Sequence, residues 1–529
     1  MSPIMNTRNF VTRLLFVAVA AVTLLFSASA YAATPGITGA SFSLDAHDGY
    51  TTQPDGASIY SWGYGCAGGT LATGNTYLPA AFSGVGFCPV MQMPGPTLIV
   101  AENQTITVTL TNNLPAPAGN TSILFPGFTV TATCVSGTCP QGVLATEATH
   151  GSTVRYSFVA STSGTHAYYS GTQPDLQIEM GMYGAVVVLP ARPVTNCTIA
   201  PGTGPYKLAK SAYDATDALG AALPSTCYDR EYLFQWAEMD GRIHRQAEQQ
   251  VQAALASGTK APLNVKIEPY KPTYFVINGR SMPDDMDADY ALNYPNQPYN
   301  GNPHMHPGDQ VLIRTIGQGR MQHPFHEHAN HVRILARDGN LIVSQTNPAL
   351  LAGRLEFNTD TTPGQAFDGI FYWSGKGLNW DIWGHKVGDG TTCTPNPPAS
   401  AFAPGYDTTG SATAVYYEWC ADHDKALEGN PGGAVAGGGP ITLPDPYIMT
   451  NGLWYNGTPY LGPDAVVRSA GPTPLPPGSA LQNPPNESGI AFMWHSHNER
   501  EITTNDVFPG GMLMMMLVDP PIFAIDETL

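Results

Sequence analysis

The sequence predicts an all-β protein built from two consecutive β-sandwiches. Hydrophobic residues make up 43% of the 529 positions and charged residues only 12%, so there is enough apolar side chain to fill more than one core. The chain also contains 56 glycines and 47 prolines, which interrupt it too often for a helical bundle and favour short strands joined by turns. Finally, two separate series of strand-like segments follow one another along the chain.

The first series lies between residues 95 and 190. Its segments are short and mostly alternate apolar with polar residues, as half-buried strands do, and turn residues separate them. This pattern is typical of an antiparallel sandwich. The expected strands are Thr97–Val100, Thr105–Leu110, Thr153–Phe158 and Tyr183–Leu189.

The second series begins near residue 231 and contains the one convincing helix, Arg245–Ser257, which is rich in Gln and Ala. We expect this helix to pack on the sandwich or cover it from solvent. Two apolar stretches near the C-terminus complete the series, and Met514, Met515 and Met516 in the second are expected to form a core strand. The expected strands are Glu231–Phe234, Tyr274–Asn278, Gln310–Arg314, Val332–Ala336, Phe367–Phe371, Ile490–His497 and Gly511–Val518.

A change of composition divides the second series. From about residue 386 to 486 the chain is rich in Gly, Pro, Thr and Asn, which we interpret as an ordered insertion or connector. The predicted organisation is a signal peptide (1–32), a first domain (33–195), the first part of a second domain (228–385), the insertion (386–486) and C-terminal strands that complete the last domain (487–529).

The N-terminus has the pattern of an export signal. Arg8 and Arg13 precede an apolar stretch, Leu14–Phe26, and Ala30-Tyr31-Ala32 is a small-residue cleavage site. An uncleaved membrane anchor is the alternative, but the apolar stretch is short for a bilayer and ends in small residues. We therefore expect a periplasmic, secreted or cell-surface protein without a transmembrane domain after cleavage.

All eight cysteines follow the predicted signal peptide, and an even number in an exported chain indicates disulfides. Zinc ligation is the competing interpretation, but the chain has no C-x-x-C pair. Because the cysteines are clustered in nearby twos, the expected pairs are Cys66–Cys88, Cys134–Cys139, Cys197–Cys227 and Cys393–Cys420.

The formal charge of −18 argues against a nucleic-acid partner, because such partners are held by neutralising phosphates with basic residues.

The arrangement of the histidines in the sequence indicates a metal-binding site. Fourteen are present, and six of them fall between residues 304 and 331. His326 and His328, like His495 and His497, are two positions apart and would share one face of a strand. If these strands are neighbours, four imidazoles converge on a patch suited to copper, zinc, iron or nickel. His323 belongs to the same candidate metal set, although its spacing places it on the opposite face unless a bulge intervenes.

Other potential ligands lie near these histidines. Glu499 or Glu501 could join the metal or accept a proton. His304-Met305-His306 precedes a Pro-Gly-Asp sequence and is expected to be a loop.

Five stretches of the chain resemble the multicopper oxidase family. Met93–Val100 is similar to the opening of its first cupredoxin domain, and Gly164–Ser170 and Gly181–Val188 to later parts of that domain. His323-Pro-Phe-His326-Glu-His328 resembles the family motif H-P-x-H-L-H, and His495-Ser-His497 with Gly511-Met512 resembles the terminal H-C-H motif. The resemblance implies tandem cupredoxin-like Greek-key sandwiches and a copper cofactor, with a Gly/Pro-rich insertion that has no counterpart.

The chain departs from the family where the first domain should supply copper ligands. In the family, two H-x-H pairs of this domain bind part of a trinuclear copper cluster that reduces dioxygen. Here Leu124 and Pro126 replace one pair, and Tyr169 and Gly171 the other. His166 is nearby but in a shifted register, and we interpret it as coincidental. A reduced number of copper ions is therefore expected.

The family's blue copper position is also altered. Such a site needs a thiolate, but Ser496 stands in place of the cysteine and Glu501 in place of the second imidazole. Met512 corresponds to the axial ligand at a longer spacing than the family pattern. The resemblance thus implies no ordinary blue copper.

Two functions follow as expectations. The first is an oxidoreductase acting at the residual histidine site on a small molecule or metal ion that coordinates the copper directly. The second is a catalytically incompetent cupredoxin scaffold that binds copper or serves a structural role at the cell surface. A homo-oligomer that completes the copper cluster in trans is a third, weaker expectation.

Overall fold

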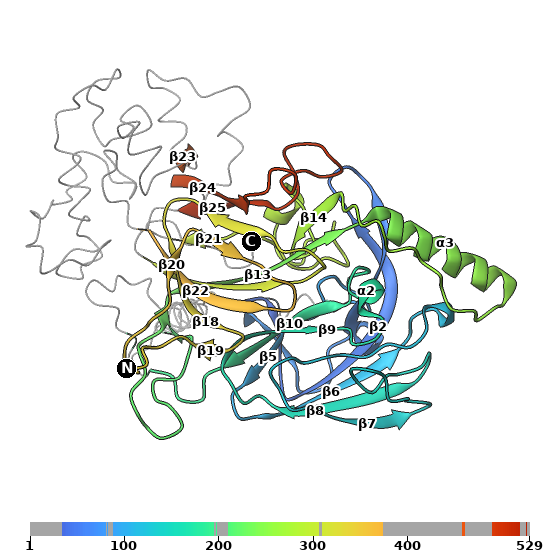
Figure 1. Ribbon diagram of the computed structural model, residues 1–529, viewed down its shortest axis with the longest axis horizontal. Coiled ribbons are helices and arrows are strands. Elements are labelled where there is room, and N and C mark those ends of the chain that lie inside the picture. Colours follow the sequence, from blue (N-terminus) through green and yellow to red (C-terminus); the bar gives the residue numbers. More distant parts are fainter. Residues whose placement is uncertain are drawn as a thin grey trace, which may run out of the picture.

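The computed structural model describes residues 34–80, 82, 88–194, 197, 210–305, 309–373, 457–460, 489–518 and 525. These residues form two β-sandwiches that pack against each other, the first in blue to blue-green and the second in green through yellow to red (Figure 1). The expected signal peptide, the Cys393–Cys420 pair and nearly all of residues 386–486 lie outside the described residues. Among the described helices, none has the length and apolar character needed to cross a membrane.

The first sandwich joins two sheets around an aromatic and aliphatic core. In β6 (Thr105–Asn112) the residues Ile106, Val108 and Leu110 point into this core and the threonines between them point outward, as the alternating sequence predicts. One sheet has the order β4 (Thr76–Leu78), β1 (Gly36–Thr38), β5 (Leu98–Ala101), β10 (Tyr183–Leu189) and β9 (Gly164–Tyr169); the other has the order β3 (Ser58–Cys66), β2 (Ser41–Thr52), β6, β8 (Thr153–Val159) and β7 (Thr131–Ser136).

The second sandwich combines residues 230–372 with the C-terminal strands. Its larger sheet has the order β14 (Tyr274–Ile277), β13 (Arg230–Met239), β16 (Gln310–Gly317), β22 (Ala366–Tyr372), β18 (Val332–Arg337) and β19 (Asn340–Leu341), with β20 (Leu355–Glu356) also on β18. The facing sheet has the order β15 (His304–Met305), β25 (Leu513–Val518), β24 (Gly489–Ser496), β17 (Pro324–Glu327) and β21 (Asn358–Asp360), with β23 (Gly457–Tyr460) on β24.

The sheets are mixed, whereas the strand pattern favoured purely antiparallel pairing. β5 runs parallel to both β1 and β10, and β13 runs parallel to β16. Segments distant in sequence become neighbours in this way, because successive strands of a Greek-key fold alternate between the two sheets. Sequence alternation reports which face of a strand is buried but not which strand lies beside it.

Short elements connect the strands. The helical ones are η1 (Ala67–Gly69), η3 (Ala116–Ala118), α2 (Pro174–Gln177) and η4 (Asp284–Met286), and β11 (Lys210–Ser211) pairs with β12 (Cys227–Tyr228).

The predicted helix is present as α3 (Gly241–Ser257), four residues longer at its N-terminus than expected. The Asp240 side chain accepts a hydrogen bond from the Arg242 backbone at 3.0 Å and caps the earlier start. Ile243, Ala247 and Val251 follow at four-residue spacing and are buried. The first two belong to the core of the first sandwich, so the helix packs on that domain as expected.

The two sandwiches meet at a buried polar junction. Thr165 on β9 donates its hydroxyl to Asp368 on β22 at 2.5 Å, and Tyr213 donates to the same carboxylate. Arg314 on β16 lies 2.8 Å from Glu231 and 3.5 Å from Asp368. The charges of this junction are therefore paired, which buried charges require.

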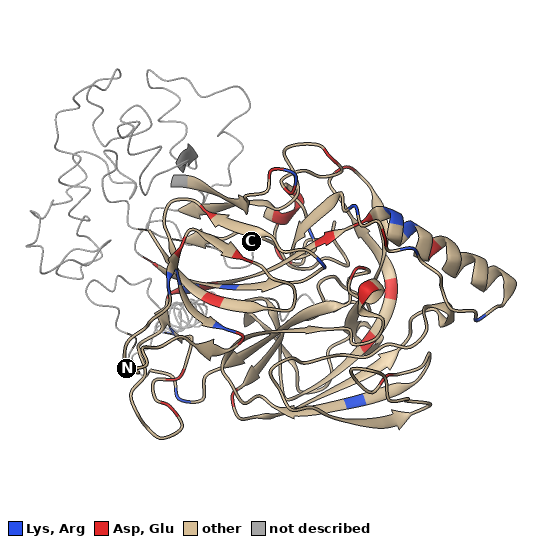
Figure 2. Ribbon diagram, in the orientation of Figure 1, with Lys and Arg blue, Asp and Glu red and all other residues tan. Residues whose placement is uncertain are grey.

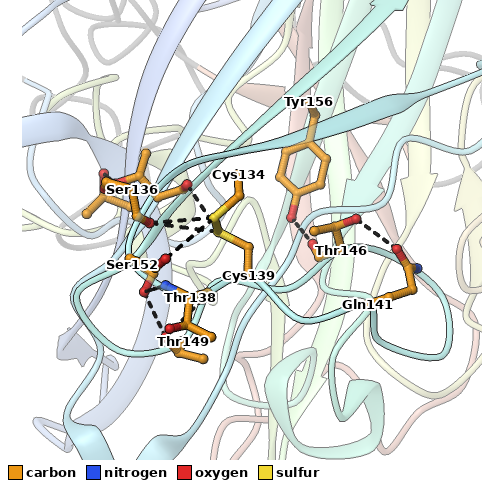
Figure 3. Close-up of a disulfide and its surroundings, with 12 residues drawn as sticks. Cys134, Ser136, Thr138, Cys139, Gln141, Thr146, Thr149, Ser152 and Tyr156 are labelled. Atoms are coloured by element: carbon orange, nitrogen blue, oxygen red, sulfur yellow. Dashed lines mark hydrogen bonds between the residues drawn. A yellow bond between two sulfur atoms is a disulfide. The ribbon is translucent and has the colours of Figure 1, made fainter.

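Three of the four expected disulfides are present: Cys66–Cys88, Cys134–Cys139 and Cys197–Cys227. Figure 3 shows the second, which closes a small turn at the exposed strand β7. Beside it, Ser152 accepts a hydrogen bond from the Thr138 backbone at 2.8 Å. Acidic residues are spread over both sandwiches, and basic residues are few and dispersed (Figure 2).

Candidate metal centre

The two histidine segments are adjacent strands. β17 and β24 pair antiparallel, with His326 directly opposite His495, although 169 positions separate them in sequence. On either side of this pair, Phe325 and Trp494 are completely buried in the core of the second sandwich. Because side chains alternate along a strand, His326 and His495 project from the opposite face of the sheet, away from that core.

Three imidazoles converge on this outer face. His326, His328 and His495 are buried, and each offers a ring nitrogen within 4.8 Å of the other two. Nε2–H of His328 donates a hydrogen bond to Nε2 of His495 at 3.0 Å. His328 follows the last residue of β17, and its backbone N–H donates to the Met493 carbonyl of β24 at 3.3 Å.

Backbone carbonyls orient two of these rings. The Nδ1–H of His326 donates to the Phe357 carbonyl at 2.6 Å, and the Nδ1–H of His495 donates to the Ser496 carbonyl at 2.7 Å. Each bond fixes the tautomer that leaves Nε2 with a free lone pair, as is usual for histidines that bind metals. The ring-nitrogen assignments follow from these hydrogen-bond partners.

The electrostatic environment keeps these rings neutral. Burial lowers the pKa of His326 to about 4, and the neighbouring rings of His495 and His497 contribute in the same direction. Burial likewise lowers the pKa of His495. At neutral pH both rings therefore have the uncharged form that coordinates a metal.

His497 lies at the solvent edge of the group. Its ring centroid is 4.8 Å from that of His326, but its side chain is 54% exposed and its nitrogens are not among the converging set. Nδ1 is 4.0 Å from Oε1 of Glu499, itself 81% exposed. His497 is therefore the exposed neighbour of the three buried rings.

His323 is on the other face of β17, as its spacing predicted, and both of its ring nitrogens are engaged. Nδ1 donates to Glu501 Oε2 at 2.8 Å and Nε2 donates to Glu238 Oε2 at 2.9 Å. All three side chains are at least 99% buried. Burial disfavours the charge, but the two carboxylates outweigh it and raise the pKa of His323 to about 9. The ring is thus an imidazolium without a lone pair for a metal.

The other residues that correspond to the family's blue copper site are also engaged in hydrogen bonds or core packing. The Ser496 hydroxyl donates to Oε2 of Glu501, and Oε1 of Glu501 accepts from the Asn498 amide at 2.8 Å. Glu501, which the sequence offered as a metal ligand or proton acceptor, therefore belongs to this buried network. Met512 is fully buried in the core of the second sandwich.

The first-domain positions show the departures expected from the sequence. Leu124 and Tyr169 face each other in a β-bridge, and their backbones hydrogen-bond at 2.7 Å. His166 is buried, its ring packs at a tilt against Phe128 with centroids 4.5 Å apart, and its Nε2 lies 3.1 Å from the Thr162 carbonyl. This packing agrees with the interpretation of His166 as coincidental. Of the residues that the structure describes, no first-domain side chain joins the converging group.

Two features of this region differ from the sequence expectation or were missed by it. His304 and Met305 form strand β15, parallel to β25, where a loop was expected. Glu238, in the middle of β13, was missed because an acidic residue in a strand is usually solvent-exposed. Its Oε1 lies 2.9 Å from the Tyr270 hydroxyl, which is also 2.7 Å from Glu179, so the buried network continues to the first domain.

Comparison with known proteins finds one matching family model and several similar solved structures. Residues 90–193 match the family model of the multicopper oxidases. No curated protein sequence matches the chain. Among solved structures, the chain is similar to the multicopper oxidase mgLAC, with 13% identity, a TM-score of 0.45, and coverage of 92% of this chain and 87% of that one.

Two copper proteins from Nitrosomonas europaea are also similar. For its blue copper oxidase the identity is 14% and the TM-score 0.45, with coverage of 90% of this chain and 85% of that one. For its copper nitrite reductase the identity is 18% and the TM-score 0.38, with coverage of 64% and 86%. The family match spans most of the first sandwich and confirms the resemblance seen in the sequence. Within residues 90–193 the chain is therefore similar to the multicopper oxidases.

Proposed function

We propose that this protein binds copper through His326, His328 and His495, at a site that keeps only the second-domain part of the family's ligand set. The observation that carries the proposal is the convergence of three buried imidazoles within 4.8 Å on the outer face of β17 and β24. Imidazole suits copper, which also has the highest affinity among the divalent first-row metals. His323 is left out of the ligand set because two carboxylates engage both of its nitrogens.

The chemistry of this site differs from that of a complete multicopper oxidase. Bound copper supplies one-electron redox chemistry. The chain has Ser496 where the family has the thiolate that passes electrons to the cluster, so a substrate has to reach the imidazole site itself. His497 and Glu499 are both exposed, and His497 lies beside the buried rings, so the two could orient a small molecule or a metal ion there.

We propose oxidoreductase activity on such a directly bound substrate as the function, in an exported protein. The export signal pattern at residues 1–32 supports that destination, together with the three disulfides. The second candidate, a scaffold that holds copper without turnover, is favoured by the loss of the first-domain ligands at Leu124 and Tyr169.

Metal analysis tests the site. We expect copper to bind to the purified wild-type protein and to be lost from the double variant His326→Ala/His495→Ala. The matched control is His150→Ala, which removes an imidazole of the first sandwich that is not in the converging group and whose Nδ1 lies 2.7 Å from the Leu114 carbonyl. Unchanged copper content in the double variant would contradict the proposal.

Oxygen consumption with phenols and with reduced metal ions separates the two candidates. Turnover that disappears in His326→Ala/His495→Ala supports the oxidoreductase. Copper binding without turnover supports the scaffold.

A further inference from the structure

The outer face that holds the imidazoles also has a pair of methionines. Met493 on β24 is directly opposite Met515 on β25. Side chains so paired have Cβ atoms about 5 Å apart, and the flexible thioether of Met can close that gap. Met493 is also two residues before His495 on the same strand, so both lie on the same face.

The burial of neighbouring residues confirms that the side chains of Met493 and Met515 point to the outer face of the sheet. Their strand neighbours Phe492, Trp494, Met514 and Met516 are at most 1% exposed and belong to the core of the second sandwich. Met493 and Met515 are only partly buried and are not members of that core. The sequence analysis expected Met514, Met515 and Met516 to form one core strand, but Met515 points to the outer face because side chains alternate.

We infer that Met493 and Met515, together with His495, form a binding site for a univalent soft metal ion, cuprous copper above all. Thioether sulfur is a soft ligand that favours Cu(I), whereas the neighbouring imidazoles also suit divalent copper. The backbone of His328 is bonded to the Met493 carbonyl, so the thioether pair adjoins the imidazole group. This inference rests on the proposed copper site. It adds that a neighbouring site binds copper in the cuprous, Cu(I), state.

Thioether ligands are uncharged at any pH, so Met493 and Met515 place no like charge beside a bound cation. A monovalent ion held by two thioethers and one imidazole also needs no carboxylate to compensate a second charge.

The test compares two double variants on the same strand pair. Met493→Leu/Met515→Leu removes the outer thioethers, and Met514→Leu/Met516→Leu removes two core thioethers. Each exchange conserves side-chain volume, and thermal unfolding verifies that both proteins fold. Cu(I) affinity is measured without oxygen by competition with a chromophoric cuprous chelator, and Cu(II) affinity is measured separately.

We expect the outer variant to lose at least about tenfold in Cu(I) affinity and to bind Cu(II) as the wild type does. The core variant should keep the wild-type affinity for both ions. X-ray absorption of the Cu(I)-loaded wild type should detect sulfur ligands that the outer variant lacks.

Equal Cu(I) affinity in the outer variant and the wild type would overturn the inference while leaving the imidazole site intact. An equal loss in both variants would also overturn it, because packing would then be the cause. Failure of the wild type to bind Cu(II) would instead count against the proposed function, so the two failures are distinguishable.

Discussion

His323 and Glu501 are joined by a hydrogen bond of 2.8 Å between Nδ1 and Oε2, and both side chains are at least 99% buried. Glu238 engages the other ring nitrogen at 2.9 Å. A doubly protonated imidazole held between two carboxylates thus occupies the position that the family resemblance assigns to a metal ion. The neighbouring imidazole group is separate, because it lies on the opposite face of β17.

Removal of this imidazolium should strongly destabilise the fold. His323→Gln leaves Glu238 and Glu501 buried without a cation between them, and breaking a buried ion pair in this way costs about 3–5 kcal/mol. The free energy of unfolding in urea measures the loss. His331→Gln is the control, because His331 is exposed and its replacement should have little effect. A decrease in the free energy of unfolding below about 1 kcal/mol would show that the ion pairs of His323 with Glu238 and Glu501 contribute little to stability.

The same triad predicts how stability depends on pH. Folding raises the pKa of His323 from 6.5 to about 9 through Glu238 and Glu501, so the folded protein holds this proton more tightly than the unfolded chain. The contribution is complete below pH 6.5 and is lost as pH rises through 9. Melting temperatures across this range should fall toward alkaline pH, and more steeply in the wild type than in His323→Gln. If the melting temperatures of the wild type and His323→Gln fell equally with rising pH, His323 would not be the group responsible.

Restoring the thiolate alone should not create a blue copper site. In Ser496→Cys the carboxylate of Glu501 still engages Nδ1 of His323, and the second imidazole of the family's site is still missing. The copper-loaded variant should therefore lack the intense blue absorption of a copper–thiolate centre, as the wild type should. Ser496→Cys/Glu501→His supplies both missing ligands and is the contrast. An intense blue absorption in the copper-loaded wild type would contradict the interpretation that Ser496 cannot replace the thiolate ligand.

The disulfides should differ in their contribution to stability. Cys66–Cys88 closes a separation of 22 residues and is buried, whereas Cys134–Cys139 closes only 5 at an exposed turn. In the chain-entropy model the longer loop is worth about 1 kcal/mol more. Cys134→Ser/Cys139→Ser should accordingly lower the unfolding free energy less than Cys66→Ser/Cys88→Ser does. The reverse order would show that the exposed turn matters more than its loop length.

Local patterns were enough to predict the all-β class, most of the strands and the three observed disulfides. Alternation placed Ile106, Val108 and Leu110 inside the first core, because the two faces of a strand have different surroundings. The same rule predicted that His326 and His323 lie on different faces. The start of α3 was missed because the cap at Asp240 lies before the Gln- and Ala-rich run.

The sequence by itself determined which chemical groups are available: second-domain imidazoles without the thiolate or the first-domain histidines. Only the tertiary structure decided how these groups are used. Pairing of β17 with β24 assembles His326, His328 and His495, and the position of β13 brings Glu238 to His323 and makes it an imidazolium. The physical reason is that strand neighbours come from distant parts of the chain, and the neighbours of a buried ring determine whether it keeps a lone pair or a proton.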